Sequence, residues 1–152
     1  MDVSGFTSYT DSEGDAAAVE LLETVRATIR RLSSIHGVRI AKWLGDGAMI
    51  VGVEPEPVIE AVVAMIEINK QILHLRAGVA EGDVILFEGD DHIGQAVNLA
   101  SRLSDLAQPG EILAPEDMMT SLLVNTRATR IGPKTVPGMA NAVSVVRLEP
   151  EP

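Results

Sequence analysis

The chain has 152 residues, enough for one domain with a full hydrophobic core. Apolar residues make up 46% of the chain and aromatic residues only 3%, so the core must be mainly aliphatic. The absence of cysteine excludes a disulfide scaffold and thiolate metal sites, and the formal net charge of −10 argues against a general nucleic-acid binder.

The apolar pattern predicts alternating helices and strands, beginning with the end of a strand at Asp2. From Asp15 to His36 apolar residues recur every three or four positions, which predicts an amphipathic helix that Gly37 ends. The inward face of this helix is predicted to consist of Val19, Leu22, Val25, Ile29 and Leu32. The other expected elements are strands at 38–44 and 48–53 around a Gly-Asp-Gly turn, a helix at 58–72, strands at 75–79 and 84–87, a helix at 95–106, a strand at 111–113, a helix at 115–123 and a strand at 142–148.

This order of elements predicts an α+β fold. Strand, helix, hairpin, helix and strand form a ferredoxin-like split βαβ sandwich, a βαββαβ core with helices on one sheet face, followed by additional C-terminal helices and strands. No repeat, linker or low-complexity run divides residues 1–152, so we expect a single domain. No run reaches about 20 apolar residues, and nothing resembles a signal peptide. We therefore expect a cytoplasmic domain without membrane contact.

Two aspartates are candidate metal ligands. Asp2 ends the first predicted strand, and Asp46 lies in the hairpin turn. Because the split βαβ topology places the first strand beside the hairpin, both carboxylates can converge at one sheet edge, where they suit Mg²⁺ or Mn²⁺. An aspartate between two glycines is also explained by turn formation alone.

Three further polar residues have both a functional and a structural explanation. Asn98 and Arg102 are four apart on a predicted helix and share one face, where an amide and a guanidinium can grip a ribose and a phosphate, or simply face water. Lys42 lies in the middle of a predicted strand, where a charge is less expected than in a loop. The structural explanation is that it lies on an edge strand or extends its amine to water. The histidines share no spacing that indicates zinc, and no glycine-rich phosphate-binding loop occurs, so a triphosphate would need metal ions and isolated basic side chains.

Five segments, in the right order, resemble the class III adenylate and guanylate cyclases. They are Asp2–Thr7, Lys42–Asp46, Arg76–Gly82, Asp91–Arg102 and Pro109–Ile112. The resemblance spans nearly the whole chain, and the joint occurrence of five motifs is far more specific than any one of them. It favours the functional explanation of each polar residue above.

The resemblance implies an adenylate cyclase that converts ATP to 3′,5′-cyclic AMP and pyrophosphate with two Mg²⁺ or Mn²⁺ ions. The implied metal ligands are Asp2, Asp46 and the carbonyl of Val3, while Asn98 orients the ribose and Arg102 offsets charge at the α-phosphate. The other implied substrate contacts are Phe6, Thr7, Lys42, Asp91, Val97 and Lys134. Arg76 belongs to a motif that the resemblance marks as structural.

Base selection is implied by one pair of residues. Lys42 can donate to adenine N1, and Asp91 can accept from the 6-amino group. Guanine presents the opposite polarity on that edge, and similar guanylate cyclases have a glutamate in place of the lysine and a small residue in place of the aspartate. The pair therefore indicates ATP.

The family's active sites lie between two head-to-tail subunits, which implies a homodimer with two shared sites. Asp2 and Asp46 come from one subunit and the nucleotide-contacting residues from the other. Two departures favour the alternative of a catalytically weak or inactive cyclase-like nucleotide-binding or regulatory dimer. Pro137 stands where a triphosphate-binding lysine is usual, with Lys134 as a substitute cation, and most of the family's first strand is missing before Asp2. Guanylate cyclase activity is opposed by Lys42, and a palm-like diguanylate cyclase or polymerase domain lacks the helix with Asn98.

Overall fold

The computed structural model describes residues 1–120 and 123–152. Its first part is β1 (Asp2–Val3), α1 (Phe6–Glu13), α2 (Asp15–His36), β2 (Arg39–Leu44), β3 (Gly47–Val51), α3 (Pro55–Asn69) and β4 (Leu75–Gly78). Its second part is β5 (Ile85–Phe87), β6 (Asp91–Ile93), α4 (Gln95–Leu106), β7 (Ile112–Pro115), the 3₁₀ turn η1 (Glu116–Met118), β8 (Thr126–Lys134) and β9 (Val143–Pro150). Apart from α1, the first part is the predicted βαββαβ core, so the α+β fold is confirmed.

One mixed sheet forms the centre of the domain. Its strands lie in the order β1-β4-β7-β9-β8, with β4 and β7 parallel and the other neighbours antiparallel. The β2–β3 hairpin continues the sheet beyond β1, because the Met1 nitrogen donates to the Ala48 carbonyl at 3.2 Å and the Ala48 nitrogen donates to the Met1 carbonyl at 3.0 Å. The first strand therefore lies beside the hairpin, as predicted.

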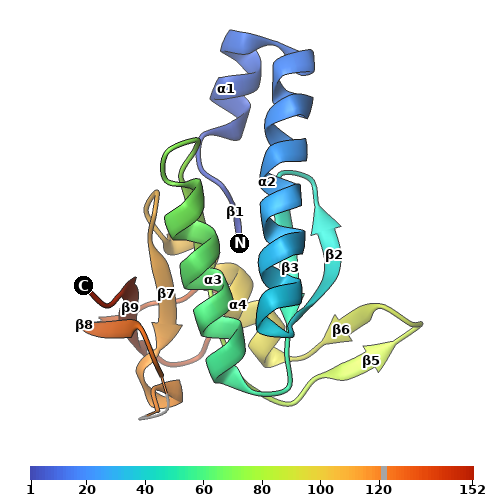
Figure 1. Cartoon of the computed structure of the whole chain (residues 1–152). Coiled ribbons are helices and arrows are strands. Elements are labelled where there is room, and N and C mark those ends of the chain that lie inside the picture. Colours follow the sequence, from blue (N-terminus) through green and yellow to red (C-terminus); the bar gives the residue numbers. More distant parts are fainter. Residues whose placement is uncertain (121–122) are drawn as a thin grey trace.

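Helices cover both faces of this sheet. α2 and α3 lie side by side on one face (Figure 1), over a core that includes Ile112 and Ala114 of β7. Leu113 points the other way, into a second cluster with Leu103 of α4. β7 is thus covered from both sides, which explains why all four of its residues are buried and apolar rather than alternating.

The amphipathic pattern of α2 is correct over its second half. Val25, Ile29 and Leu32 are buried, and Gly37 ends the helix with a φ of 68°. Val19 was predicted to face inward but is 55% exposed. This part of α2 lies beside α1 (Figure 1), and there the small Ala18 rather than Val19 is buried.

Three expectations need correction. The helix predicted at 58–72 begins and ends three residues earlier, because a proline in the first turn suits a helix start. The helix predicted at 115–123 is wrong: only η1 forms, the backbone leaves helical conformation at Met119, and residues 121–122 lie outside the described part of the chain. The elements α1, β6 and β8 were not expected. α1 buries no residue, and β8 contains Gly132 and Pro133, so neither has the apolar periodicity on which the prediction relied.

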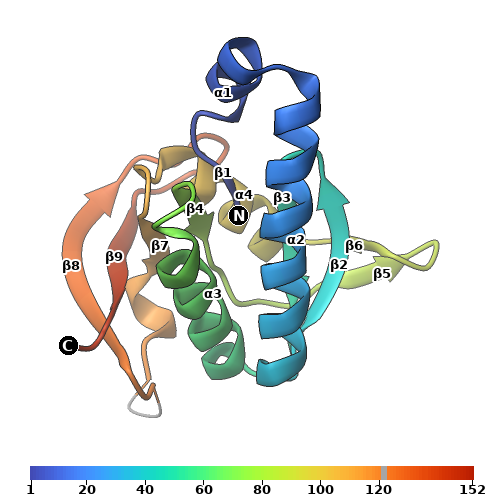
Figure 2. The same ribbon diagram turned by 45° about the horizontal axis from the view of Figure 1, so that its top comes forward.

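A projecting hairpin completes the fold. Figures 1 and 2 show β5 and β6 extending away from the body beside β2. Four large apolar side chains of this hairpin are each more than half exposed: Ile85, Leu86, Phe87 and Ile93. None of the helices in the described ranges is long and apolar enough to cross a membrane.

Candidate active site

Asp2 is held by an arginine from the neighbouring strand. In the antiparallel pair of β1 and β4, Asp2 lies opposite Arg76. The Arg76 Nε donates to Asp2 Oδ1 at 2.6 Å, Nη2 donates to Oδ2 at 3.4 Å, and Nη1 donates to the Asp105 carbonyl of α4 at 3.2 Å. The hydrogen bond to Asp2 raises the pKa of Arg76, and the negative charges of Asp2, Asp105 and Asp46 add to the effect while partial desolvation opposes it. Arg76 therefore stays cationic and orients both oxygens of Asp2.

Asp46 lies in the two-residue turn between β2 and β3, next to β1. Gly45 has a φ of +61°, which favours glycine at the first turn position. A Cβ on Gly47 would stand 2.5 Å from the Met1 carbonyl oxygen and 3.2 Å from the Asp2 Cβ, so only glycine allows the turn to approach β1 so closely. The backbone that bears Asp46 is thereby brought against Asp2. The Asp46 side chain is half-buried and has no hydrogen bond or ion pair within residues 1–120 and 123–152.

Lys42 and Asp91 meet between β2 and β6. The Lys42 Nζ donates to Asp91 Oδ1 at 2.9 Å, and the two side chains are 40% and 60% exposed. A second contact joins the same strands, where Arg39 Nη2 lies 3.3 Å from His92 Nε2. These polar contacts fix the projecting hairpin against the outer edge of β2 and place an amine and a carboxylate together at an accessible surface.

Asn98 and Arg102 lie on the exposed side of α4. Among residues 1–120 and 123–152, Arg102 has one distant ion pair, 3.8 Å from Nη1 to Asp105 Oδ2, and its side chain is more than half exposed. Val97, which directly precedes Asn98 in this helix, is half-buried. The opposite side of α4 packs tightly on β4, because Gly78 lacks a Cβ that would overlap the α4 backbone. The amide and the guanidinium therefore share one accessible face on a firmly packed helix.

The remaining predicted residues lie at the start of α1 and the end of β8. Phe6 is half-buried and packs partly against the core, whereas Thr7 is exposed. Lys134 is the exposed last residue of β8 and forms no ion pair in the described part of the chain. Val136, two residues later, is buried in the cluster beneath α4, which brings the segment with the exposed Pro137 to the α4 side of the sheet.

Comparison with known proteins decides the family. A family model of the adenylate and guanylate cyclase catalytic domain matches residues 1–146. The chain belongs to this family.

The cyclase domain is similar to parts of longer bacterial proteins. An uncharacterized Mycobacterium tuberculosis protein is 33% identical over 99% of this chain and 40% of its own length. A pH-sensitive adenylate cyclase from the same species is 30% identical over 80% of this chain and 31% of its own, and an adenylate cyclase of Streptomyces coelicolor is 30% identical over 83% and 33%. The chain therefore spans about a third to two fifths of the length of these relatives.

Solved structures agree with the fold of the cyclase domain. The adenylyl cyclase CyaB from P. aeruginosa superimposes with a TM-score of 0.79 at 19% identity, covering 99% of this chain and 91% of that one. A guanylate cyclase domain of RhGC from Catenaria anguillulae, in complex with GTP, gives 0.81 at 17% identity over 99% and 93%. Because adenylate and guanylate cyclases superimpose equally well, the fold does not distinguish the two substrates.

The carboxylate pair of the cyclase domain fits hard divalent cations, of which cyclases of this family use two. Asp2 and Asp46 both contribute negative charge at Arg76, and Asp46 is free to bind. Within the described residues no cluster of three or more acidic, histidine or cysteine side chains could hold a metal alone. A cation held by these two residues would need further oxygens, from a backbone carbonyl such as that of Val3, from water or from a phosphate.

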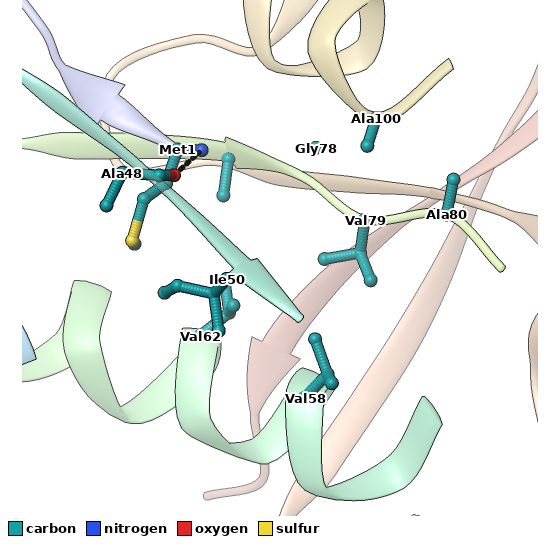
Figure 3. A pocket seen from close by; sticks show the side chains of 10 residues that line it. Met1, Ala48, Ile50, Val58, Val62, Gly78, Val79, Ala80 and Ala100 are labelled. Carbon is teal, nitrogen blue, oxygen red and sulfur yellow. Dashed lines mark hydrogen bonds between the residues drawn. The ribbon is translucent and has the colours of Figure 1, made fainter. Parts of the chain in front are cut away.

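Two cavities of the cyclase domain are lined by other residues. One of about 70 Å³ is lined by Met1, β3, α3, the end of β4 and Ala100, and Figure 3 shows that most of its lining side chains are apolar. The other, of about 370 Å³, lies between α3 and the start of β7 and contains none of the predicted site residues. Asp91, Asn98 and Arg102 lie on open surface of the single subunit, whereas Val3 is buried and Asp2 is only 25% exposed.

Arg76 was missed as a site residue. The sequence motif assigns it to a structural strand, but its guanidinium contacts a candidate metal ligand directly. The signal that would have identified it is the register of β1 and β4, which places Arg76 opposite Asp2.

Proposed function

We propose that this domain is an adenylate cyclase that converts ATP to 3′,5′-cyclic AMP and pyrophosphate. The observation that carries the proposal is the contact between Lys42 and Asp91, 2.9 Å from Nζ to Oδ1. The Lys42 amine is a donor that matches the acceptor N1 of adenine, and the Asp91 carboxylate is an acceptor that matches the 6-amino group. The two protein groups are neighbours, as are the two groups of the base. The adenylate cyclase names of the two relatives at 30% identity agree with this choice of base.

The reaction assigns a role to each group of residues. When bound, two Mg²⁺ or Mn²⁺ ions supply activation of the ribose 3′-hydroxyl and neutralisation of the triphosphate. Asp2 and Asp46 hold these ions, with the Val3 carbonyl as a further ligand. Asn98 orients the ribose, and Arg102 offsets the charge that develops at the α-phosphate. Donors positioned in this way typically contribute about 3–4 kcal/mol of transition-state stabilisation.

The remaining contacts hold the substrate. Phe6 and Thr7, at the start of α1, offer backbone N–H groups toward the phosphates next to the metal ligands. Val97, one residue before Asn98, contacts the nucleoside, and Lys134 pairs with the terminal phosphates. Together with the metal ligands, these residues surround every charged part of the nucleotide.

The active unit is a homodimer with two shared sites. Asp2 and Asp46 of one subunit and the base, ribose and phosphate contacts of the other enclose each nucleotide. The exposed apolar side chains of the β5–β6 hairpin favour association, because a cluster of large exposed apolar residues is a common mark of an interface. The exposed positions of Asn98 and Arg102 on α4 agree with a site that a second subunit completes.

A product assay tests the proposal. The purified domain is incubated with Mn²⁺ and either ATP or GTP, its oligomeric state is measured by light scattering, and products are identified by mass spectrometry. We expect cyclic AMP from the dimer, with ATP strongly preferred, and no product from Asp46→Asn. A dimer that makes only cyclic GMP, or no cyclic nucleotide, contradicts the proposal.

The second candidate is a nucleotide-binding dimer with little or no turnover. It is favoured by Pro137, which stands on the α4 side where a triphosphate-binding lysine is usual. ATP binding in calorimetry without cyclic AMP formation distinguishes this candidate. If Pro137→Lys then increases ATP affinity without turnover, the regulatory function is supported.

A further inference from the structure

An arginine of α2 reaches the turn that carries Asp46. The Arg26 Nη2 donates to the Gly45 carbonyl at 2.8 Å, and the Arg26 guanidinium carbon lies 4.7 Å from the centre of the Trp43 ring. Arg30, one helical turn later, stacks on the same ring at 5.1 Å but makes no hydrogen bond to the turn. Arg26 is therefore held at two points, by a ring and by a carbonyl oxygen.

The contact with Arg26 restrains the turn through the Gly45 carbonyl. In a two-residue hairpin turn the carbonyl of the first central residue is not part of the ladder between the strands, so it needs another donor or water. Along the β1 edge, Gly47 lies against Asp2 and Met1. Arg26 thus contacts Gly45 and β1 contacts Gly47, which are the residues on either side of Asp46.

We infer that Arg26 is a positioning residue for Asp46, and that it sets the metal affinity of the site by fixing the Gly45 carbonyl. The Asp46 side chain has no partner within the described residues, so its direction depends on the turn backbone that Arg26 and Gly47 hold. Loss of the Arg26 hydrogen bond lets the Gly45–Asp46 peptide rotate, and the carboxylate then samples a wider range of directions. This inference rests on the proposed role of Asp46 as a metal ligand.

The inference is tested by comparing three variants, Arg26→Ala, Arg26→Lys and Arg30→Ala. Arg30→Ala is the matched control, because it removes an equivalent cation from the same ring without touching the turn. Amide hydrogen exchange of Asp46 and Gly47 is measured by NMR, Mn²⁺ binding to the metal-free dimer by electron paramagnetic resonance, and folding by thermal unfolding. Arg26→Lys keeps the cation near Trp43 and supplies a fold-competent variant if the alanine variant unfolds.

We expect Arg26→Ala to weaken Mn²⁺ binding about 3- to 10-fold, the range that loss of one hydrogen bond produces, and to accelerate exchange at both amides. Arg26→Lys is expected to lie between this variant and wild type, and Arg30→Ala to change Mn²⁺ binding less than about twofold. Equal effects of Arg26→Ala and Arg30→Ala, or no effect of either, overturn the inference, as does a wild-type dimer that binds no Mn²⁺. If Mn²⁺ binding depends on Arg26 but no cyclic nucleotide forms, the proposed function fails and the positioning role stands.

Discussion

Exchanging Lys42 and Asp91, the pair proposed to contact the base, tests the choice of substrate most directly. In Lys42→Glu with Asp91→Ser, an acceptor replaces the amine and a small residue replaces the carboxylate. Adenine N1 then faces a carboxylate, and the 6-amino group loses its acceptor, whereas guanine gains an acceptor for its N1–H. We expect the ratio of kcat/KM for ATP to that for GTP to fall, and the preferred substrate to change.

The magnitude follows from the position of the pair. A polar group left without its partner in a closed site costs about 1–3 kcal/mol, or roughly 5- to 150-fold in rate, so two such changes shift the ATP to GTP ratio by about 30-fold or more. In the free subunit the same side chains are 40% and 60% exposed, and an exposed ion pair contributes only about 0–1 kcal/mol to stability. The double variant should therefore change specificity strongly and thermal stability hardly at all.

The assay compares initial rates with ATP and GTP over a range of concentrations, at fixed Mn²⁺, for wild type and variant dimers. Lys70→Glu is the control, because Lys70 is an exposed lysine at the end of α3 that pairs with Glu67, away from the site. It changes the net charge by −2, more than the −1 of the double variant, and should still leave the ratio unchanged. A folded, dimeric double variant with the wild-type ratio refutes the assignment of Lys42 and Asp91 to the base.

Three further outcomes are expected. Mixed dimers of Asp46→Ala and Arg102→Ala chains should recover activity at one of two sites, since both defects fall in the same site and the other site is built from unaltered residues; properly mixed but inactive dimers would contradict shared sites. Arg76→Met should destabilise the domain by about 1–3 kcal/mol in denaturant unfolding, because Asp2 is only 25% exposed and loses its partner, and Mn²⁺ should restore part of this loss. Gly78→Ala should cost about 1–3 kcal/mol or more, since its methyl group overlaps the Ala100 carbonyl oxygen and the Ser104 nitrogen of α4; unchanged unfolding would show that α4 can move away at little cost.

Much of the core was predictable because its signals are local. α2 and α4 have the bounds that apolar spacing predicts, and the turn at Asp46 follows from its two glycines. The edge strand β8 was not predictable in this way, because its burial pattern does not alternate strongly and a bulge interrupts its pairing between Arg130 and Gly132.

The site was predictable only in part, for a physical reason. Residue spacing and family resemblance identify candidate residues that share a helix, a turn or a motif, such as Asn98 and Arg102. Contacts across the sheet depend on register, which the sequence does not specify without knowing which strands pair. Arg76 reaches Asp2 across 74 residues of sequence, and Arg26 reaches Gly45 from a different layer, so both emerge only from the assembled fold.

The contact between Arg76 and Asp2 also determines how metals and nucleotide can bind together. Asp2, Asp46 and Arg76 together carry one net negative charge and Asp105 adds another nearby, and the four positive charges of two divalent cations would more than compensate them. Arg76 also holds both oxygens of Asp2, so a metal ion must compete with a fixed cation for its ligand. A triphosphate removes both obstacles, because it neutralises the excess positive charge and offers the guanidinium other oxygens. Metal and nucleotide should therefore bind cooperatively, each more tightly in the presence of the other.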